Sequence, residues 1–138
     1  MDIQEKIQQI NYGAENTMLS TLGIEITDVG DTFICGKMPV DHRTKQPFGL
    51  LHGGTSVALA ETLGSIGGGF KVFNTNETVV GIAINSNQLK SIRDGWVFGK
   101  ATPNKISKNI QVWEINITNE DNELICISRL TLAVVAKT

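Results

Sequence analysis

Cysteine is scarce in this sequence, whose 138 residues include only Cys35 and Cys126. Two cysteines far apart, with no CxxC pair, lack the pattern of a zinc site or of a disulfide framework. We therefore expect both thiols to be reduced and buried, in a cytoplasmic protein. No metal ion and no redox cofactor are expected.

Basic charge and uninterrupted apolar runs are also missing. Lys and Arg number 12 against 14 Asp and Glu, a formal net charge of -2, whereas non-specific nucleic-acid binders are usually basic. The stretch from Gly53 to Phe70 is broken by Glu61, by hydroxyl side chains and by glycines. The N-terminal segment lacks the basic start and apolar run of a signal peptide. Nucleic-acid binding, a membrane span and secretion are therefore not expected.

The composition is that of one folded unit. Apolar residues make up 41% and charged residues 19% of the chain, a balance typical of globular proteins that bury a core. No linker, internal repeat or low-complexity tract divides the sequence. We expect a single domain over residues 1–138.

The order of the predicted elements indicates an α+β fold. Isoleucines recur at helical spacing in residues 2–12, and residues 18–22 add a further turn. Two strands follow, then a loop, then a long glycine-containing helix over residues 53–70. Four segments rich in β-branched residues end the chain. We expect an antiparallel sheet curved around the long helix. The predicted strands are residues 23–29, 32–40, 78–89, 95–104, 109–120 and 123–136.

The segment QPFGLLHGGTSVALAETLGS, residues 46–65, combines a His-Gly-Gly turn with one acidic residue. Gly53 and Gly54 open the long helix, where the first N–H groups lack intrahelical partners and carry partial positive charge. Such an N–H can polarise a carbonyl group and stabilise an oxyanion. For a lone Gly-Gly pair, a tight turn without any chemical role is the favoured explanation.

Glu61 lies among apolar neighbours on this helix, and a carboxylate in a dry pocket is a candidate base or nucleophile. A solvated helix face is the alternative. Ser65, one turn further on, could hydrogen-bond the carboxylate. Because a helix rises about 1.5 Å per residue, Glu61 lies roughly 12 Å from Gly53 along the axis. One carbonyl group cannot touch both residues in the same subunit, so a shared role requires a second chain.

The segment MPVDHRTKQPFGLLHGGTSVALAE, residues 38–61, resembles the hotdog-fold acyl-CoA thioesterases of the phenylacetate and 4-hydroxybenzoyl-CoA thioesterase type. VVGIAINSNQLKS, QVWEI and SRLTLA extend the resemblance over nearly the whole chain. It is greatest to the bacterial 1,4-dihydroxy-2-naphthoyl-CoA thioesterases of menaquinone biosynthesis. The resemblance implies a six-stranded antiparallel sheet wrapped around a long helix. It also implies a homodimer, often paired into a homotetramer.

The resemblance further implies roles for five residues. Glu61 matches the catalytic carboxylate, and Gly53 matches the oxyanion donor, which comes from the opposite subunit. Gln46 matches a residue that contacts the thioester carbonyl region. His52 matches the histidine that shapes the same pocket, and Ser65 matches a hydroxyl that helps to place the water or the carboxylate.

A larger set matches positions that contact the acyl group or CoA. The basic residues are expected at two adjacent strand ends, where they would suit the phosphates of CoA. Protection of a strand edge against further pairing is an equally good explanation for each of these residues taken alone. Gln88 and Lys90 stand where close relatives often carry His and Arg. The full set is Phe48, Leu51, Thr62, Gly81, Gln88, Leu89, Lys90, Ser91, Arg93, Lys105, Ser107 and Lys108.

The expected reaction is hydrolysis of an aromatic acyl-CoA, such as 1,4-dihydroxy-2-naphthoyl-CoA, to the free acid and CoA without a cofactor. Glu61 would attack the carbonyl carbon or activate a water, and the sequence leaves both routes open. A thioesterase for hydroxyphenylacetyl-CoA or for aryl groups on a carrier protein is one alternative. A non-catalytic acyl-CoA binding module is another. A hotdog dehydratase is disfavoured because its His-Phe-Pro-Gly pattern is absent.

Overall fold

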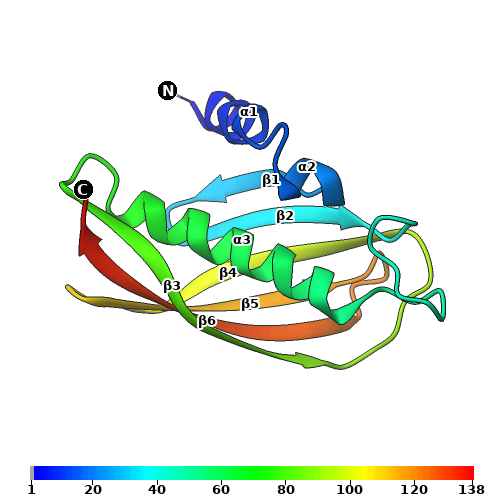
Figure 1. Cartoon of the computed structure of the whole chain (residues 1–138). Helices are drawn as coiled ribbons and strands as arrows, with labels where there is room; N and C mark the ends of the chain where they lie inside the picture. Colours follow the sequence, from blue (N-terminus) through cyan, green and yellow to red (C-terminus); the bar gives the residue numbers. More distant parts are fainter. Residues whose placement is uncertain (1) are drawn as a thin grey trace.

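The computed structural model describes residues 2–138 and shows one long helix lying across a face of a six-stranded antiparallel sheet (Figure 1). Two shorter helices precede the sheet in the chain. The helices are α1 (Ile3–Gly13), α2 (Met18–Leu22) and α3 (Gly53–Lys71). The strands are β1 (Glu25–Gly30), β2 (Phe33–Pro39), β3 (Glu77–Gln88), β4 (Trp96–Ile106), β5 (Ile110–Thr118) and β6 (Leu124–Ala136).

The strand order is β1-β2-β4-β5-β6-β3, and every neighbouring pair is antiparallel. Strand β3 follows the long helix in the chain and takes the outer place beside β6. The predicted α+β architecture is thereby confirmed. The observed elements begin and end within a few residues of the predicted ones.

Helix α3 packs on the sheet through small residues. Its buried side chains recur at helical spacing from Ser56 to Gly68. A Cβ atom at Gly67 would come within 2.7 Å of the Trp113 ring, and one at Gly64 within 2.6 Å of the Leu130 side chain. Glycine therefore lets the helix backbone approach the sheet closely, which outweighs its low helix propensity.

Strand β3 is a long edge that is largely open to solvent. It has 12 residues, and most of its middle is exposed. Val80 and Ile82 are 47% and 57% exposed, which is unusual for apolar side chains on a sheet. An unpaired edge with apolar side chains is a template for another strand. Within residues 2–138, no helix is long and apolar enough to cross a membrane.

Candidate active site

His52 caps the N-terminus of α3. Its Nδ1 atom accepts a hydrogen bond from the Gly54 N–H at 2.8 Å. A neutral imidazole that accepts at Nδ1 carries its proton on Nε2, which is left to face solvent or a ligand. The His52 N–H donates to the Thr44 carbonyl at 2.8 Å, which holds the cap against the preceding loop.

Gly53 is the first residue of α3, and its N–H has no acceptor among residues 2–138. The helix behind it is 19 residues long, so partial positive charge gathers at this end. The Gln88 side chain lies over Gly53 and donates from Nε2 to the Gly53 carbonyl at 3.3 Å. This free N–H at a long helix N-terminus is suited to bind a carbonyl oxygen or an oxyanion.

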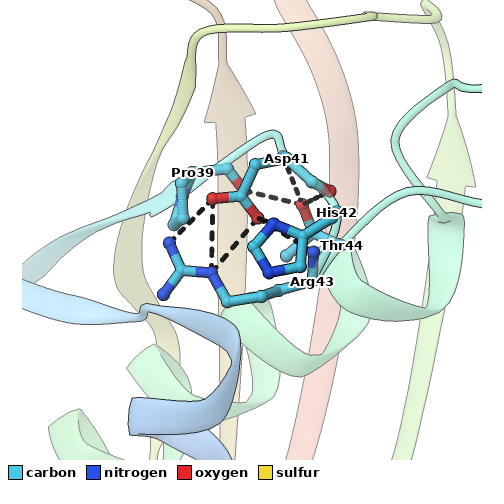
Figure 2. A network of polar contacts seen from close by, with 5 residues as sticks. All are labelled: Pro39, Asp41, His42, Arg43 and Thr44. Carbon is cyan, nitrogen blue, oxygen red and sulfur yellow. Dashed lines mark hydrogen bonds and ion pairs between the residues drawn. The ribbon is translucent and has the colours of Figure 1, made fainter.

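The loop between β2 and α3 is held by a compact polar network (Figure 2). The Asp41 carboxylate pairs with the Arg43 guanidinium at 2.7 Å and accepts from the Arg43 backbone N–H at 2.9 Å. These hydrogen bonds from Arg43 lower the pKa of Asp41 to about 2. The buried Thr44 hydroxyl donates to the Pro39 carbonyl at 2.7 Å. The network ties the end of β2 to the residues that position His52.

Gln46 and Phe48 form a turn at the rim of this site. The Gln46 side-chain oxygen accepts from the Phe48 N–H at 2.5 Å, and the Gln46 carbonyl accepts from the Gly49 N–H at 2.9 Å. The Gln46 carboxamide nitrogen therefore stays available as a donor. Phe48 is 83% exposed, so its ring makes an apolar rim without a partner in the single subunit. Gly49 closes the turn with φ 82°, which favours glycine.

A cavity of about 190 Å³ lies beside the α3 N-terminus. Wider hollows of about 450 and 500 Å³ lie elsewhere, and neither is lined by a predicted site residue. The smaller cavity is lined by Leu51, Gly53, Ser56, Gln88, Leu89, Lys90, Ser91 and Ile125.

Glu61 is exposed, so the expectation that the helix would cover it is wrong for the single subunit. The buried row of α3 runs through Ser56, Leu59 and Leu63, and Glu61 lies on another side of the helix. Within the described chain, no hydrogen bond joins Glu61 to Ser65, contrary to the pairing considered from their spacing. Its carboxylate faces solvent on the exposed flank of α3.

The basic residues do not gather at one place in a single subunit. Lys90 and Arg93 follow the end of β3, near the α3 N-terminus; Arg93 lies 3.8 Å from the site of a Cβ on Gly49. Lys105 lies at the far end of β4, and Lys108 lies in the turn to β5. An 11-residue strand spans roughly 35 Å, so the expectation of two adjacent strand ends is wrong within one chain. Antiparallel topology explains the error, because β3 and β4 end at opposite margins of the sheet.

The structure therefore brings part of the predicted site together. Glu61, Thr62 and Ser65 lie further along α3, where the Thr62 hydroxyl donates to the Ala58 carbonyl at 2.7 Å. Gly81 lies at a register shift in the middle of β3, and Ser107 lies with Lys108 in the distant turn between β4 and β5. The group around the α3 N-terminus comprises Gln46, Phe48, Leu51, His52, Gly53, Gln88, Leu89, Lys90, Ser91 and Arg93.

Two buried polar residues near the site, Ser56 and Thr44, were not predicted from the sequence. Ser56 occupies a position of the apolar row of α3, where a hydroxyl is out of place. Thr44 is 1% exposed in a loop that otherwise faces solvent. A polar residue at a core position is the pattern that would have indicated Ser56, whereas nothing local marks Thr44.

Three comparisons place this chain among known proteins. The thioesterase superfamily matches residues 48–126, more than half of the chain. The 1,4-dihydroxy-2-naphthoyl-CoA hydrolase of Escherichia coli K12 is 44% identical over 93% of this chain and 91% of its own length. The crystal structure of a thioesterase from Haemophilus influenzae is 51% identical, with a TM-score of 0.91, over 94% of this chain and 90% of that one. A mutant thioesterase from Pseudomonas aeruginosa is 39% identical, with a TM-score of 0.92, over 95% and 94% of the two chains.

Proposed function

This chain belongs to the thioesterase superfamily and is a thioester hydrolase with the hotdog fold, and from this we propose that its substrate is an aromatic acyl-CoA. The observation that carries this substrate class is the 44% identity, over 93% of the chain, to the Escherichia coli 1,4-dihydroxy-2-naphthoyl-CoA hydrolase. The specific candidate is 1,4-dihydroxy-2-naphthoyl-CoA, which would place the reaction in menaquinone biosynthesis. Water and the thioester would yield the free acid and CoA.

The proposed site is shared by two subunits. Gly53 and Glu61 lie roughly 12 Å apart along one helix, too far to act on a single carbonyl group. Glu61 is exposed, and β3 pairs with β6 on one side only, so within the described chain its outer edge has no strand beside it. A second copy paired antiparallel along β3 would run its α3 in the opposite direction. The N-terminus of one helix would then lie beside the middle of the other.

The same pairing accounts for the separated basic residues. Antiparallel pairing along β3 would bring the turn between β4 and β5 of one subunit to the sheet margin where β3 of the other subunit ends. Lys105 and Lys108 would then approach the margin that carries Lys90 and Arg93. Four cations gathered in this way suit the phosphates of CoA. The dimer is the smallest unit that this proposal requires, and a tetramer would pair two such dimers.

In the proposed reaction, the Gly53 N–H donates to the thioester carbonyl oxygen. The Glu61 carboxylate either adds to the carbonyl carbon or takes a proton from a water that adds to it. The carbonyl electron pair moves to the oxygen, and the oxyanion faces the Gly53 N–H, a donor typically worth about 3 kcal/mol. The C–S bond then breaks, and the sulfur leaves with its electron pair and takes up a proton as free CoA. If a water has added, the free acid forms directly; if Glu61 has added, a water then hydrolyses the acyl–Glu61 anhydride to the free acid and regenerates the carboxylate. No step in this sequence needs a cofactor.

Release of free thiol from a panel of thioesters tests this proposal. The panel should contain aromatic acyl-CoAs, long-chain acyl-CoAs and an aryl carrier-protein thioester, each with the wild type and Glu61→Gln. We expect aromatic acyl-CoAs to be hydrolysed fastest. The variant should lose several orders of magnitude in kcat with little change in KM, because its amide can neither attack nor accept a proton.

Other outcomes would redirect the proposal. A preference for the carrier-protein thioester would indicate a role in removing wrong acyl groups from a carrier. Near-wild-type turnover by Glu61→Gln would remove Glu61 from the mechanism. Binding of acyl-CoA without turnover of any thioester would favour a non-catalytic binding module.

A further inference from the structure

Ser56 interrupts the apolar row of α3 side chains that faces the sheet. It is fully buried, as are Leu59 and Leu63 in the same row. Its Oγ atom has no hydrogen-bond partner among residues 2–138. A buried hydroxyl without a partner costs about 1–3 kcal/mol, and such groups are rare in folded proteins. A hydroxyl kept at this cost points to a partner supplied by a ligand.

The position of Ser56 indicates where that ligand lies. In a helix, each Cα–Cβ bond leans toward the N-terminus, so a side chain covers the preceding turn. Ser56 therefore lies over the turn that begins with Gly53, and both residues line the cavity of about 190 Å³. The Gly53 N–H also lacks an acceptor within the described residues. Two hydrogen-bond donors without acceptors thus border one small cavity.

The remaining wall of the cavity fits one end of a thioester. Leu51, Leu89 and Ile125 supply apolar surface, and the Gln88 carboxamide covers Gly53. A Cβ at Gly53 would approach the Gln88 side chain to 3.2 Å, so the Gln88 carboxamide packs closely against the first residue of α3.

We propose that Ser56 is a substrate-binding residue whose hydroxyl donates a second hydrogen bond, beside that of Gly53, to the thioester carbonyl oxygen. The inference rests on the proposed hydrolysis of an acyl-CoA. As the carbonyl carbon becomes tetrahedral, its oxygen gains negative charge, and hydrogen bonds from both donors strengthen. Ser56 therefore acts more on the transition state than on the bound substrate.

Two CoA analogues test this contact in the full-length protein. One is a ketone that keeps the carbonyl group but has a methylene between sulfur and carbonyl carbon, and the other is a thioether of similar size without a carbonyl. We expect Ser56→Ala to lower the affinity for the ketone about 10-fold and to leave the affinity for the thioether unchanged, as measured by calorimetry. In hydrolysis, kcat should fall about 10- to 100-fold with a small change in KM. An equal loss of affinity for both analogues, or an unchanged kcat, would overturn the proposal.

Stability distinguishes this role from a structural one. Ser56→Ala removes a buried hydroxyl that has no partner, so denaturant unfolding should show equal or greater stability. Ser128→Ala is the matched control, because the equally buried Ser128 hydroxyl pairs with Ser86 at 2.5 Å. The control should lose stability and keep its turnover within about threefold. Ser56→Ala losing as much stability as Ser128→Ala would show that Ser56 serves the fold instead.

The experiment also separates this inference from the proposed function. If the wild type hydrolyses no thioester of the panel, the proposed substrate class fails. Binding of the ketone and the thioether to the wild type and to Ser56→Ala still reports directly on the Ser56 contact, because it requires no turnover. If Ser56→Ala then loses affinity for the ketone and keeps its affinity for the thioether, Ser56 is supported as a carbonyl-binding residue of a non-catalytic site.

Discussion

The Lys90 ammonium group forms an ion pair with the Glu123 carboxylate, which joins the segment after β3 to the turn between β5 and β6. Asn119 donates a second hydrogen bond to the same carboxylate at 3.0 Å. The pKa of Glu123 is held below its ordinary value mainly by the hydrogen bond from Lys90 and next by the one from Asn119. If Lys90 binds a phosphate of CoA, that phosphate competes with the Glu123 carboxylate for the ammonium group.

Glu123→Gln should therefore lower KM for acyl-CoA by about two- to fivefold, because exposed ion pairs compete only weakly. Its kcat should be unchanged. Steady-state kinetics with an acyl-CoA and with the matching pantetheine thioester, which has no phosphate, provide the check. Asp121→Asn is the control, since it removes the same charge from the same turn. Equal effects of Glu123→Gln on the two substrates would argue against a phosphate at Lys90.

Thr44 supports the loop that leads to His52 (Figure 2). Thr44→Val keeps the shape of the side chain but leaves the Pro39 carbonyl without its donor. We expect a loss of about 1–3 kcal/mol in the free energy of unfolding, together with a lower kcat because the His52 cap shifts. Thr44→Ser keeps the hydroxyl and should restore both quantities, measured by urea unfolding and thiol release. A Thr44→Ser variant as weak as Thr44→Val would contradict the view that the Thr44 hydroxyl alone supports the loop.

The hydrogen bond from Gly54 to His52 predicts that His52 stabilises α3 as an N-cap. His52→Ala should lose about 0.5–2 kcal/mol of stability, whereas His52→Asn should recover most of it because Asn is a favourable cap. Thermal and urea unfolding of the two variants measure this difference. Equal instability of both variants would show that capping is not what His52 contributes to the fold.

Asp41 makes stability depend on pH in a definite direction. Its pKa is lowered from 3.8 to about 2 by hydrogen bonds from Arg43, so the folded state favours the charged carboxylate. Its contribution is complete above the ordinary pKa and is lost as the pH falls from about 4 to about 2. Unfolding of the wild type and Asp41→Asn at several pH values should show a difference that shrinks over this range. A difference that is constant down to pH 2 would contradict the role of the Asp41–Arg43 pair.

Local features of this fold were predicted well from the sequence. Features that depend on which strands pair with one another were predicted poorly. The His-Gly-Gly turn, the long helix and the alternation around Trp113 are encoded in neighbouring residues, so their elements appear where expected. The exposure of Glu61 was not foreseen, because small apolar neighbours cover a helix only on the side that packs. The separation of Lys90 from Lys105 depends on which strand ends share a margin, and that is decided by long-range pairing.

Ser56 shows which property of a buried residue can be predicted from the sequence and which cannot. Its burial could be predicted from its place in the apolar row, but the lack of a partner for its hydroxyl depends on every group around it in three dimensions. The proposed site between two subunits is a similar case. The helical rise sets the Gly53 to Glu61 separation, whereas the open β3 edge that could admit a second subunit is visible only in the folded chain.

Mixing two inactive variants tests the shared site most directly. Gly53→Pro removes the N–H at the first helical position, where proline is tolerated, and the His52 backbone at φ -72° and ψ 126° suits a residue before proline. Gly53→Ala, which keeps the N–H, is its control.

Gly53→Pro and Glu61→Gln should each be inactive as pure proteins. After subunit exchange in equal amounts, each mixed dimer would contain one intact site, so thiol release from the best thioester should return to about a quarter of the wild-type rate. Mass spectrometry of the intact complexes would establish that mixed dimers have formed. Their formation without any recovery of hydrolysis would contradict a site built from Gly53 of one subunit and Glu61 of the other.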